Sequence, residues 1–257
     1  MSFCSKLTLT LEYVTEASLP APRSSRSVGH GRPAGGRLRL LAAAEQLFAT
    51  RGLEVPNREI VAAAGQHNRS AITYHFGSRA RLVDSVRERH ETPIAQHRQH
   101  LIARLPGPGD QTTRQLVEAY IQPLAAEMLH CAPSYWARLS ELLLADQPLR
   151  VRSDTRPSGH PRADPVLTGL LDFMAAHLSH LPEPEAADRV ALTVRFLNSG
   201  LARWEHDNQD DAYPVAPLTS FTLILSDLAV AMLDAPSSVP PDSDAYFEYS
   251  HLVGHQA

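Results

Sequence analysis

The chain has 257 residues, a formal net charge of −4 and two cysteines. This length can bury a sizeable core in one large or two smaller domains, whereas Cys4 and Cys131 are too few for a disulfide framework or a cysteine-rich zinc site. No apolar run approaches the roughly 18–20 residues that span a bilayer, and residues 1–15 lack the basic start and apolar core of a secretory signal. We therefore expect a soluble, cytoplasmic protein without membrane contact.

The charge is unevenly distributed along the chain. Between Pro22 and His90 there are twelve arginines but only five acidic residues, whereas the remainder is acidic. This segregation fits a basic DNA-binding module joined to a regulatory or assembly domain.

Residues 1–36 are poorly patterned, and we expect a disordered leader. Leu7, Leu9 and Leu11 alternate with threonines as in a short strand, but no second strand stands nearby to pair with it. Pro20 to Gly36 has the composition of a flexible basic arm, either a solvated tail or a contact to DNA phosphate or the minor groove.

Residues 37–90 have the pattern of a helix-turn-helix domain. Arg37 to Thr50 has apolar residues on one face and is predicted to be a helix ended by Arg51 and Gly52. Two short helices should follow within Val55 to Leu82, separated by a tight break at Gly65, because glycine adopts left-handed geometry without a steric cost. The second of them is amphipathic, with polar and basic residues on its outer face, as in a helix that reads the DNA major groove.

The ends of these helices can also be predicted. Asn57 can cap the first short helix, or Pro56 can occupy its first position. Ser78 should cap a helix that starts at Arg79 and runs towards Leu105, with Pro93 bending or dividing it.

The rest of the chain predicts further helices and no convincing strand pair. The fold class is therefore all-α with about nine helices: an N-terminal helix-turn-helix domain (37–90), a C-terminal helical regulatory and dimerisation domain (91–235) and a flexible tail (236–257). A mobile loop is expected at 147–165. The predicted helices of the C-terminal domain span 112–130, 134–145, 164–181, 183–206 and 215–233.

The segment Arg37 to Val86 resembles the TetR family of bacterial transcriptional repressors. The resemblance rests on Ala43-Ala44-Glu45-Gln46-Leu47-Phe48, on Arg58-Glu59-Ile60-Val61 leading to Ala64-Gly65, and on Tyr74-His75-Phe76-Gly77-Ser78-Arg79. It implies a homodimeric, all-helical repressor whose DNA affinity a small molecule often lowers. From Gly65 to Phe76 this chain is one residue longer than the commonest family pattern, so positions 66–70 do not map individually.

Several residues of this segment are candidates for DNA contact. The resemblance implies that Tyr74 and Arg79 bind phosphates, and bidentate hydrogen bonding makes Arg69 the best candidate for a base edge. His75 can serve as a cap or as a phosphate contact. The full predicted DNA-binding set is Asn57, His67, Asn68, Arg69, Ser70, Thr73, Tyr74, His75 and Arg79.

The last two predicted helices have apolar rows that alternate by four and three residues, as in coiled coils. Two copies of each would form a four-helix dimer interface, with Ser199 and Gly200 allowing close approach. The predicted interface residues are Val190, Val194, Leu197, Leu201, Leu218, Phe221, Leu225, Leu228 and Met232.

Aromatic residues of the C-terminal domain suggest a pocket for a small apolar or aromatic effector, although each of them can also simply fill the core. The candidate pocket residues are Tyr120, Met128, Trp136, Phe173, Phe196 and Trp204.

Other functions have weaker support in the sequence. Three histidines, His90, His97 and His100, have spacings that could bind zinc if a carboxylate joined them, but we interpret them as a solvated helix face and expect no metal site and no cofactor. No motif of a known catalytic class is present, so no enzyme is expected. The expected partners are double-stranded DNA, a second copy of the chain and the effector. The alternative is a helix-turn-helix protein controlled by a protein partner instead of a small molecule.

Overall fold

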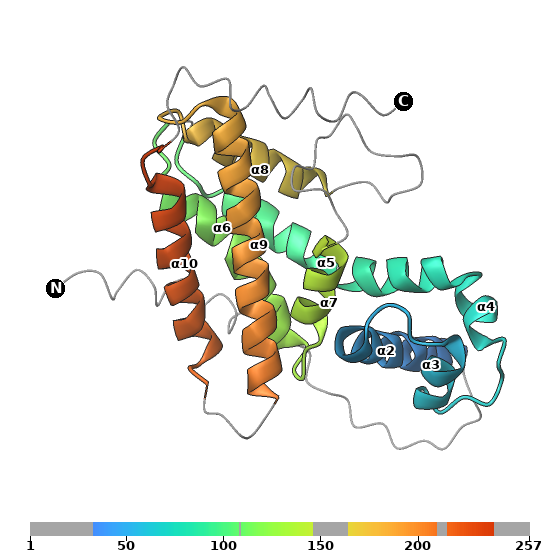
Figure 1. The fold of residues 1–257 in the computed structure, drawn as a ribbon. Coiled ribbons are helices and arrows are strands. Elements are labelled where there is room, and N and C mark those ends of the chain that lie inside the picture. The colour runs from blue at the N-terminus through green and yellow to red at the C-terminus, as the bar shows by residue number, and fades with distance from the viewer. Residues whose placement is uncertain (1–32, 108, 146–163, 210–214, 239–257) are drawn as a thin grey trace, which may run out of the picture.

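The computed structural model describes residues 33–107, 109–145, 164–209 and 215–238. Every regular element that these residues form is an α-helix, so the predicted all-α fold is confirmed (Figure 1). The helices are α2 (Pro33–Arg51), α3 (Asn57–Ala63), α4 (Ala71–Phe76), α5 (Arg79–Ile102), α6 (Thr113–His130), α7 (Trp136–Ala145), α8 (Pro165–His177), α9 (Glu183–Asn208) and α10 (Leu218–Asp234).

The N-terminal domain begins earlier than predicted. Helix α2 starts at Pro33, so the expected flexible arm is helical over residues 33–36. Proline is favourable at a helix start, and Gln66 Nε2 donates a hydrogen bond to the Gly36 carbonyl over 2.7 Å. A Cβ at position 36 would lie 3.2 Å from the same Gln66 nitrogen. Because Gly36 has no side chain, Gln66 in the turn between α3 and α4 can approach α2 closely. Residues 1–32, with the possible strand, lie outside the described residues.

Helices α2, α3 and α4 pack around a shared core together with the start of α5. Gly65 and Gly77 have φ angles of 63° and 78°, which let the chain turn sharply after α3 and α4. The predicted break at Gly65 is thereby confirmed. The fully buried side chains of this core include Leu40, Ala44, Phe48, Ile60, Leu82 and Val86.

Helix α5 connects the small domain to the body. It is continuous through Pro93, and Ser78 caps it by accepting a hydrogen bond from the Arg81 backbone N–H, as predicted. Its start contacts α2 and α4, whereas further along it contacts α6 and α8 (Figure 1). A tilt of α5 would therefore move the small domain relative to the body.

The body consists of α6 to α10, with α9 and α10 side by side. No helix among the described residues is long and apolar enough to cross a membrane. Most of the predicted loop at 147–165 and the tail beyond residue 238 lie outside the described residues.

Most of the predicted dimer row lies inside one chain, so that part of the prediction is wrong. Val190, Val194, Leu197, Leu201, Leu218 and Leu225 are buried within the protomer. Gly200 faces Leu225 of the same chain, not a second copy. A row spaced by three and four residues identifies a buried helix face but not the molecule that buries it. Of the predicted set, Leu228 and Met232 are exposed and Phe221 is half-buried.

Candidate DNA-binding surface and the core behind it

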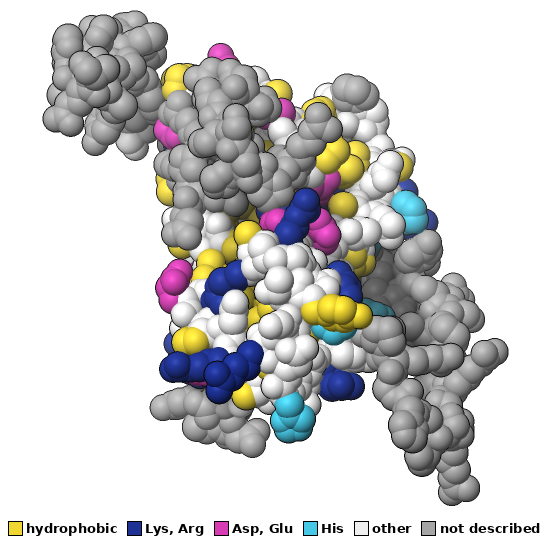
Figure 2. Space-filling model, turned by 90° about the vertical axis from the view of Figure 1, so that its right-hand side faces the viewer, with side chains coloured by type: hydrophobic (Ala, Val, Ile, Leu, Met, Phe, Trp, Pro, Cys, Tyr) yellow, Lys and Arg dark blue, Asp and Glu magenta, His cyan; other side chains and the backbone are white. Residues whose placement is uncertain are grey.

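Helix α4 presents one polar face to solvent. Ala71, Ile72 and Phe76 are buried against the domain core, whereas Thr73 is exposed and Tyr74 is 76% exposed. In the turn before the helix, His67, Asn68, Arg69 and Ser70 are exposed as well. Figure 2 views the molecule from this end and shows arginine and histidine side chains spread over its lower part, where acidic groups are few. The sequence therefore folds so that its predicted recognition helix is accessible.

Asn68 shapes the turn that leads into α4. Its Oδ1 accepts a hydrogen bond from the Ser70 backbone N–H over 2.9 Å, while Ser70, at the N-cap of α4, makes no capping bond with its own side chain. Such Asx turns fix the backbone locally. Asn68 therefore orients the residues around it, including Arg69, and its Oδ1 is already used within the protein.

Arg79, predicted as a phosphate contact, is bound within the domain. Its guanidinium donates to Asn57 Oδ1 over 2.6 Å and to the Leu53 carbonyl, and it lies over the Phe48 ring. Asn57, which is the first residue of α3 and not its cap, serves as the acceptor. Arg79 and Asn57 thus join the N-terminal ends of α5 and α3, which points to a positioning role for both.

Two arginines that were not predicted lie beside this junction. Arg58 and Arg81 stand in the first turns of α3 and α5, and both are exposed. Neither guanidinium group has a hydrogen-bond or ion-pair partner among the residues that the structure describes, although the Arg81 backbone N–H donates to Ser78 Oγ. A cation in the first turn of a helix is disfavoured by the helix dipole, so the position of these two arginines in the sequence could have singled them out as candidates for phosphate contact.

His75 is half-buried between its neighbours on α4. Its ring packs edge-on against the rings of Tyr74 and Phe76, with centroid distances of 4.9 and 6.3 Å. The Nε2 atom would lie 3.4 Å from a Cβ at Gly36, so His75 also faces α2. Its place fits packing between α2 and α4 better than contact with DNA.

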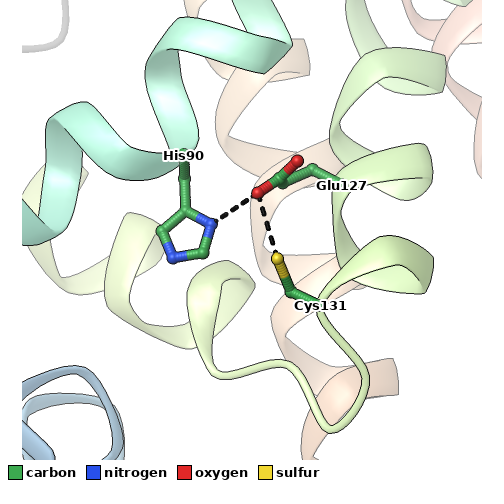
Figure 3. Close-up of side chains that lie close together, drawn as sticks. All are labelled: His90, Glu127 and Cys131. Atoms are coloured by element: carbon green, nitrogen blue, oxygen red, sulfur yellow. Dashed lines mark hydrogen bonds and ion pairs between the residues drawn. The ribbon is translucent and has the colours of Figure 1, made fainter. Parts of the chain in front are cut away.

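Behind the small domain, a buried histidine links α2, α5 and α6. His90 of α5 is fully buried, and its Nδ1 lies 2.8 Å from Glu127 Oε1 of α6, which also accepts a hydrogen bond from Cys131 Sγ over 3.2 Å (Figure 3). On the other side of the ring, Nε2 lies 3.1 Å from Glu45 Oε2 of α2. The sequence interpretation placed His90 on a solvated face, which is wrong, because residues from three helices enclose it.

The charges around His90 settle its protonation. Burial by itself would lower the pKa of the imidazole, but hydrogen bonds and charge attraction from Glu127 and Glu45 outweigh it and raise the pKa to about 9. Burial, with the hydrogen bond and charge of Glu127, raises the pKa of the Cys131 thiol to about 12. At neutral pH His90 is therefore a cation between two carboxylates, and Cys131 is a thiol.

The candidate pocket residues have different surroundings within the part of the chain that the structure describes. Tyr120 is buried and accepts a hydrogen bond from Asn198 Nδ2, and Trp136 is buried against His90 with ring centroids 4.8 Å apart. Phe173 and Phe196 are half-buried core residues. Met128 and Trp204 line a cavity of about 490 Å³ where the end of α6 meets α7 and α9.

This cavity has both apolar and polar walls. Met128, Leu129, Pro133, Tyr135 and Trp204 line it together with Ser134, Glu205 and Gln209. Both carboxylate oxygens of buried Glu205 already accept hydrogen bonds, from Ser134 Oγ and from the backbone N–H groups of Ala137 and Arg138. The polar side of the cavity is therefore held rigidly by the start of α7.

Comparison with known proteins identifies the small domain. Residues 40–86 match the family described as bacterial regulatory proteins, tetR family. A search of curated protein sequences found no match. The structure is also similar to solved structures at low identity. One is a gamma-butyrolactone receptor described as an ArpA-like protein, with 17% identity over 77% of this chain and 98% of that chain and a TM-score of 0.45.

Two further solved structures show comparable similarity. The fatty acid degradation regulator FadR from Bacillus halodurans has 16% identity over 80% of this chain and 99% of that chain, with a TM-score of 0.46. SmeT, the repressor of the Stenotrophomonas maltophilia multidrug efflux pump SmeDEF, has 16% identity over 79% and 95%, with a TM-score of 0.37. The family match, which spans α2 to the start of α5, confirms the resemblance found in the sequence: residues 40–86 match the TetR family of bacterial regulatory proteins.

Proposed function

We propose that this protein is a homodimeric transcriptional repressor that binds a palindromic operator and releases it when a small molecule binds the body. The observation that carries the proposal is the accessible outer face of α4 within a TetR-family domain, where Tyr74 is 76% exposed beside Thr73 and Arg69. A helix that packs its apolar side so completely while exposing these groups is suited to enter the major groove.

The residues around α4 divide into two roles. Arg69 and Thr73 read base edges, since arginine can bind guanine with two hydrogen bonds. The Tyr74 hydroxyl and the unpaired cations Arg58 and Arg81 bind phosphates, which provides affinity without sequence preference. Arg79 and Asn57 hold the scaffold on which these groups stand.

The dimer forms through the outer faces of α9 and α10. On α10, Ile224, Leu228 and Met232 are spaced four residues apart and are 51%, 49% and 36% exposed, and Leu192 of α9 is 49% exposed. A monomer would leave this apolar row in water, whereas a second copy would bury it. The interface thus uses the same two helices as predicted from the sequence and keeps Leu228 and Met232 of the predicted set, whereas Ile224 and Leu192 take the place of its buried members.

The effector occupies the cavity at the end of α6. Its walls combine apolar side chains, Trp204 among them, with fixed polar groups, as binding sites for small organic molecules do. Helix α6 packs on α5, which leads to the DNA-binding domain. Such a ligand releases DNA only if it binds the DNA-incompetent arrangement more tightly, and fluorescence of Trp204 offers a direct signal for its binding.

The test is selection of bound duplexes from a random DNA pool, followed by mobility-shift titration. We expect enrichment of an inverted repeat that binds at least about 1,000-fold more tightly than random DNA at physiological salt. Equal affinity for every selected and random duplex would refute a sequence-specific regulator.

A further inference from the structure

The cluster of His90, Glu127 and Cys131 brings three different metal-ligand types together where α5 meets α6. Their donor atoms, His90 Nδ1, Glu127 Oε1 and Cys131 Sγ, all lie within 4.8 Å of one another (Figure 3). Each of the first two side chains is buried, and Cys131 at the end of α6 is partly exposed. From this geometry we propose that the three residues form a binding site for a divalent transition-metal ion, with Zn²⁺ as the ion that fits best.

The separations of the donor atoms suit a tetrahedral ion. With Zn–N, Zn–O and Zn–S bonds of about 2.0–2.3 Å, tetrahedral donors lie about 3.4–3.6 Å apart. The present distances are 2.8 Å from nitrogen to oxygen and 3.2 Å from sulfur to oxygen, and the nitrogen and sulfur lie at most 4.8 Å apart. The two measured distances are shorter than the tetrahedral ones by less than about 1 Å, so small side-chain movements suffice to admit the ion.

The donor set also selects the class of ion. Thiolate and imidazole are ligands of Zn²⁺ and related first-row ions, whereas Mg²⁺ and Ca²⁺ prefer oxygen donors alone. Three protein ligands leave the fourth position of a tetrahedral ion for a water molecule.

Glu45 supplies the outer support that metal-binding histidines normally have. With a metal on Nδ1, the remaining His90 proton sits on Nε2, which lies 3.1 Å from Glu45 Oε2 and at present makes no well-aligned hydrogen bond. A carboxylate in this position fixes the ring and makes it a better ligand. Arg89 lies 3.5 Å from the same Glu45 oxygen and forms an ion pair with it.

Glu127 holds the three donor atoms together. Its Oε1 lies 2.8 Å from His90 Nδ1 and 3.2 Å from Cys131 Sγ, so both neighbours already face the same carboxylate oxygen.

The site would connect the small domain to the body. Its ligands stand on α5 and at the end of α6, its support stands on α2, and Trp136 of α7 stacks on the His90 ring. Occupation would therefore shift the position of α2 relative to α6. An effect on DNA affinity rests on the proposed function, whereas metal binding itself does not.

Co²⁺ titration of the untagged, full-length protein tests the site. A thiolate bond to Co²⁺ produces a strong near-ultraviolet absorption band that carboxylate and imidazole ligands do not produce. Addition of Zn²⁺ should displace the Co²⁺ and remove this band. We expect one equivalent per chain. Cys131→Ser should abolish the band, and Glu45→Gln should weaken metal affinity by about 10–100-fold without removing it.

Two controls separate this site from other donors in the chain. Cys4→Ser should keep the band, because Cys4 lies outside the proposed set. The double variant His97→Ala/His100→Ala should keep it too, although those histidines stand on the same helix. Retention of the band in Cys131→Ser, or absence of any thiolate band in the folded wild type, would overturn the proposal. These readouts need no DNA, so a failure of the proposed function leaves them interpretable.

Discussion

Gly200 of α9 lies directly against Leu225 of α10, so closely that a Cβ on the glycine would stand 2.6 Å from Leu225 Cδ2. Both residues belong to the same chain. The two helices therefore approach each other closely inside the protomer, and the proposed dimer interface uses their outer sides.

Gly200→Ala should lower the free energy of unfolding by about 1–3 kcal/mol, because the new methyl group must displace a packed leucine. Denaturant unfolding measures this loss. Gly169→Ala in α8 is the matched control, since a Cβ there meets nothing within 4 Å. That control should be neutral or gain up to about 1 kcal/mol from its higher helix propensity. A loss of the same size at both glycines would contradict the close packing.

Leu228→Arg should separate the dimer while the chain stays folded. Leu228 is 49% exposed on the outer face of α10, so the charge would be solvated in a monomer but unpaired in the interface. Sedimentation at micromolar concentration measures whether the dimer has separated, and circular dichroism measures whether the chain is still folded. Leu225→Arg, which places the charge in the protomer core, should instead unfold the chain. Ala176→Arg, at an exposed position of α8, should change neither.

Leu225 is buried and Leu228 is exposed, although both lie in the same predicted apolar row of α10. The difference shows which features of the helix could be predicted from the sequence. Apolar periodicity predicted both helices closely, because any buried face needs it. It could not assign the faces, since α10 carries leucines on two sides and both satisfy the same spacing. Which face packs on α9 is decided by the small residue Gly200, and that contact joins residues on two different helices.

Arg79→Ala should cost stability as well as DNA affinity. Removing the guanidinium leaves Asn57 Oδ1 and the Leu53 carbonyl without their donor, which should lower the free energy of unfolding by about 1–3 kcal/mol. Arg81→Ala is the matched comparison, because it should leave stability within about 0.5 kcal/mol but weaken binding to all DNA. For Arg81→Ala, the slope of log K for DNA binding against log salt concentration should become less negative by about 0.9, because one phosphate contact is lost. Unchanged stability of Arg79→Ala would show that this arginine is free for phosphate.

Arg69→Ala should relax discrimination at one base pair in each half-site. The exposed guanidinium precedes α4, and loss of a bidentate contact should cost about 1–3 kcal/mol on the preferred sequence. Titrations against single-base variants of the selected duplex measure the effect. Tyr74→Phe should instead reduce affinity for all of these duplexes alike. A uniform loss in Arg69→Ala would reassign that residue to phosphate binding.

The candidate site was predictable where it depends on local sequence and not where it depends on distant contacts. The turn at Gly65, the cap at Ser78 and the outer face of α4 follow from neighbouring residues. The environment of His90 does not, because Glu45 and Glu127 come from helices 45 positions before and 37 positions after it. A solvated face and a buried ion-pair cluster have the same spacing of histidines, so only the packing of α2, α5 and α6 distinguishes them.

The most direct test of the account changes the spacing between the two half-sites of the selected duplex. A symmetric dimer places its two reading helices about 34–36 Å apart, one helical turn of DNA. Insertion of about five base pairs, half a turn, turns one half-site to the opposite side of the duplex. Mobility-shift titration should then show affinity falling to that of random DNA. Equal affinity for the original and the lengthened duplex would contradict a dimer that reads DNA with two α4 helices.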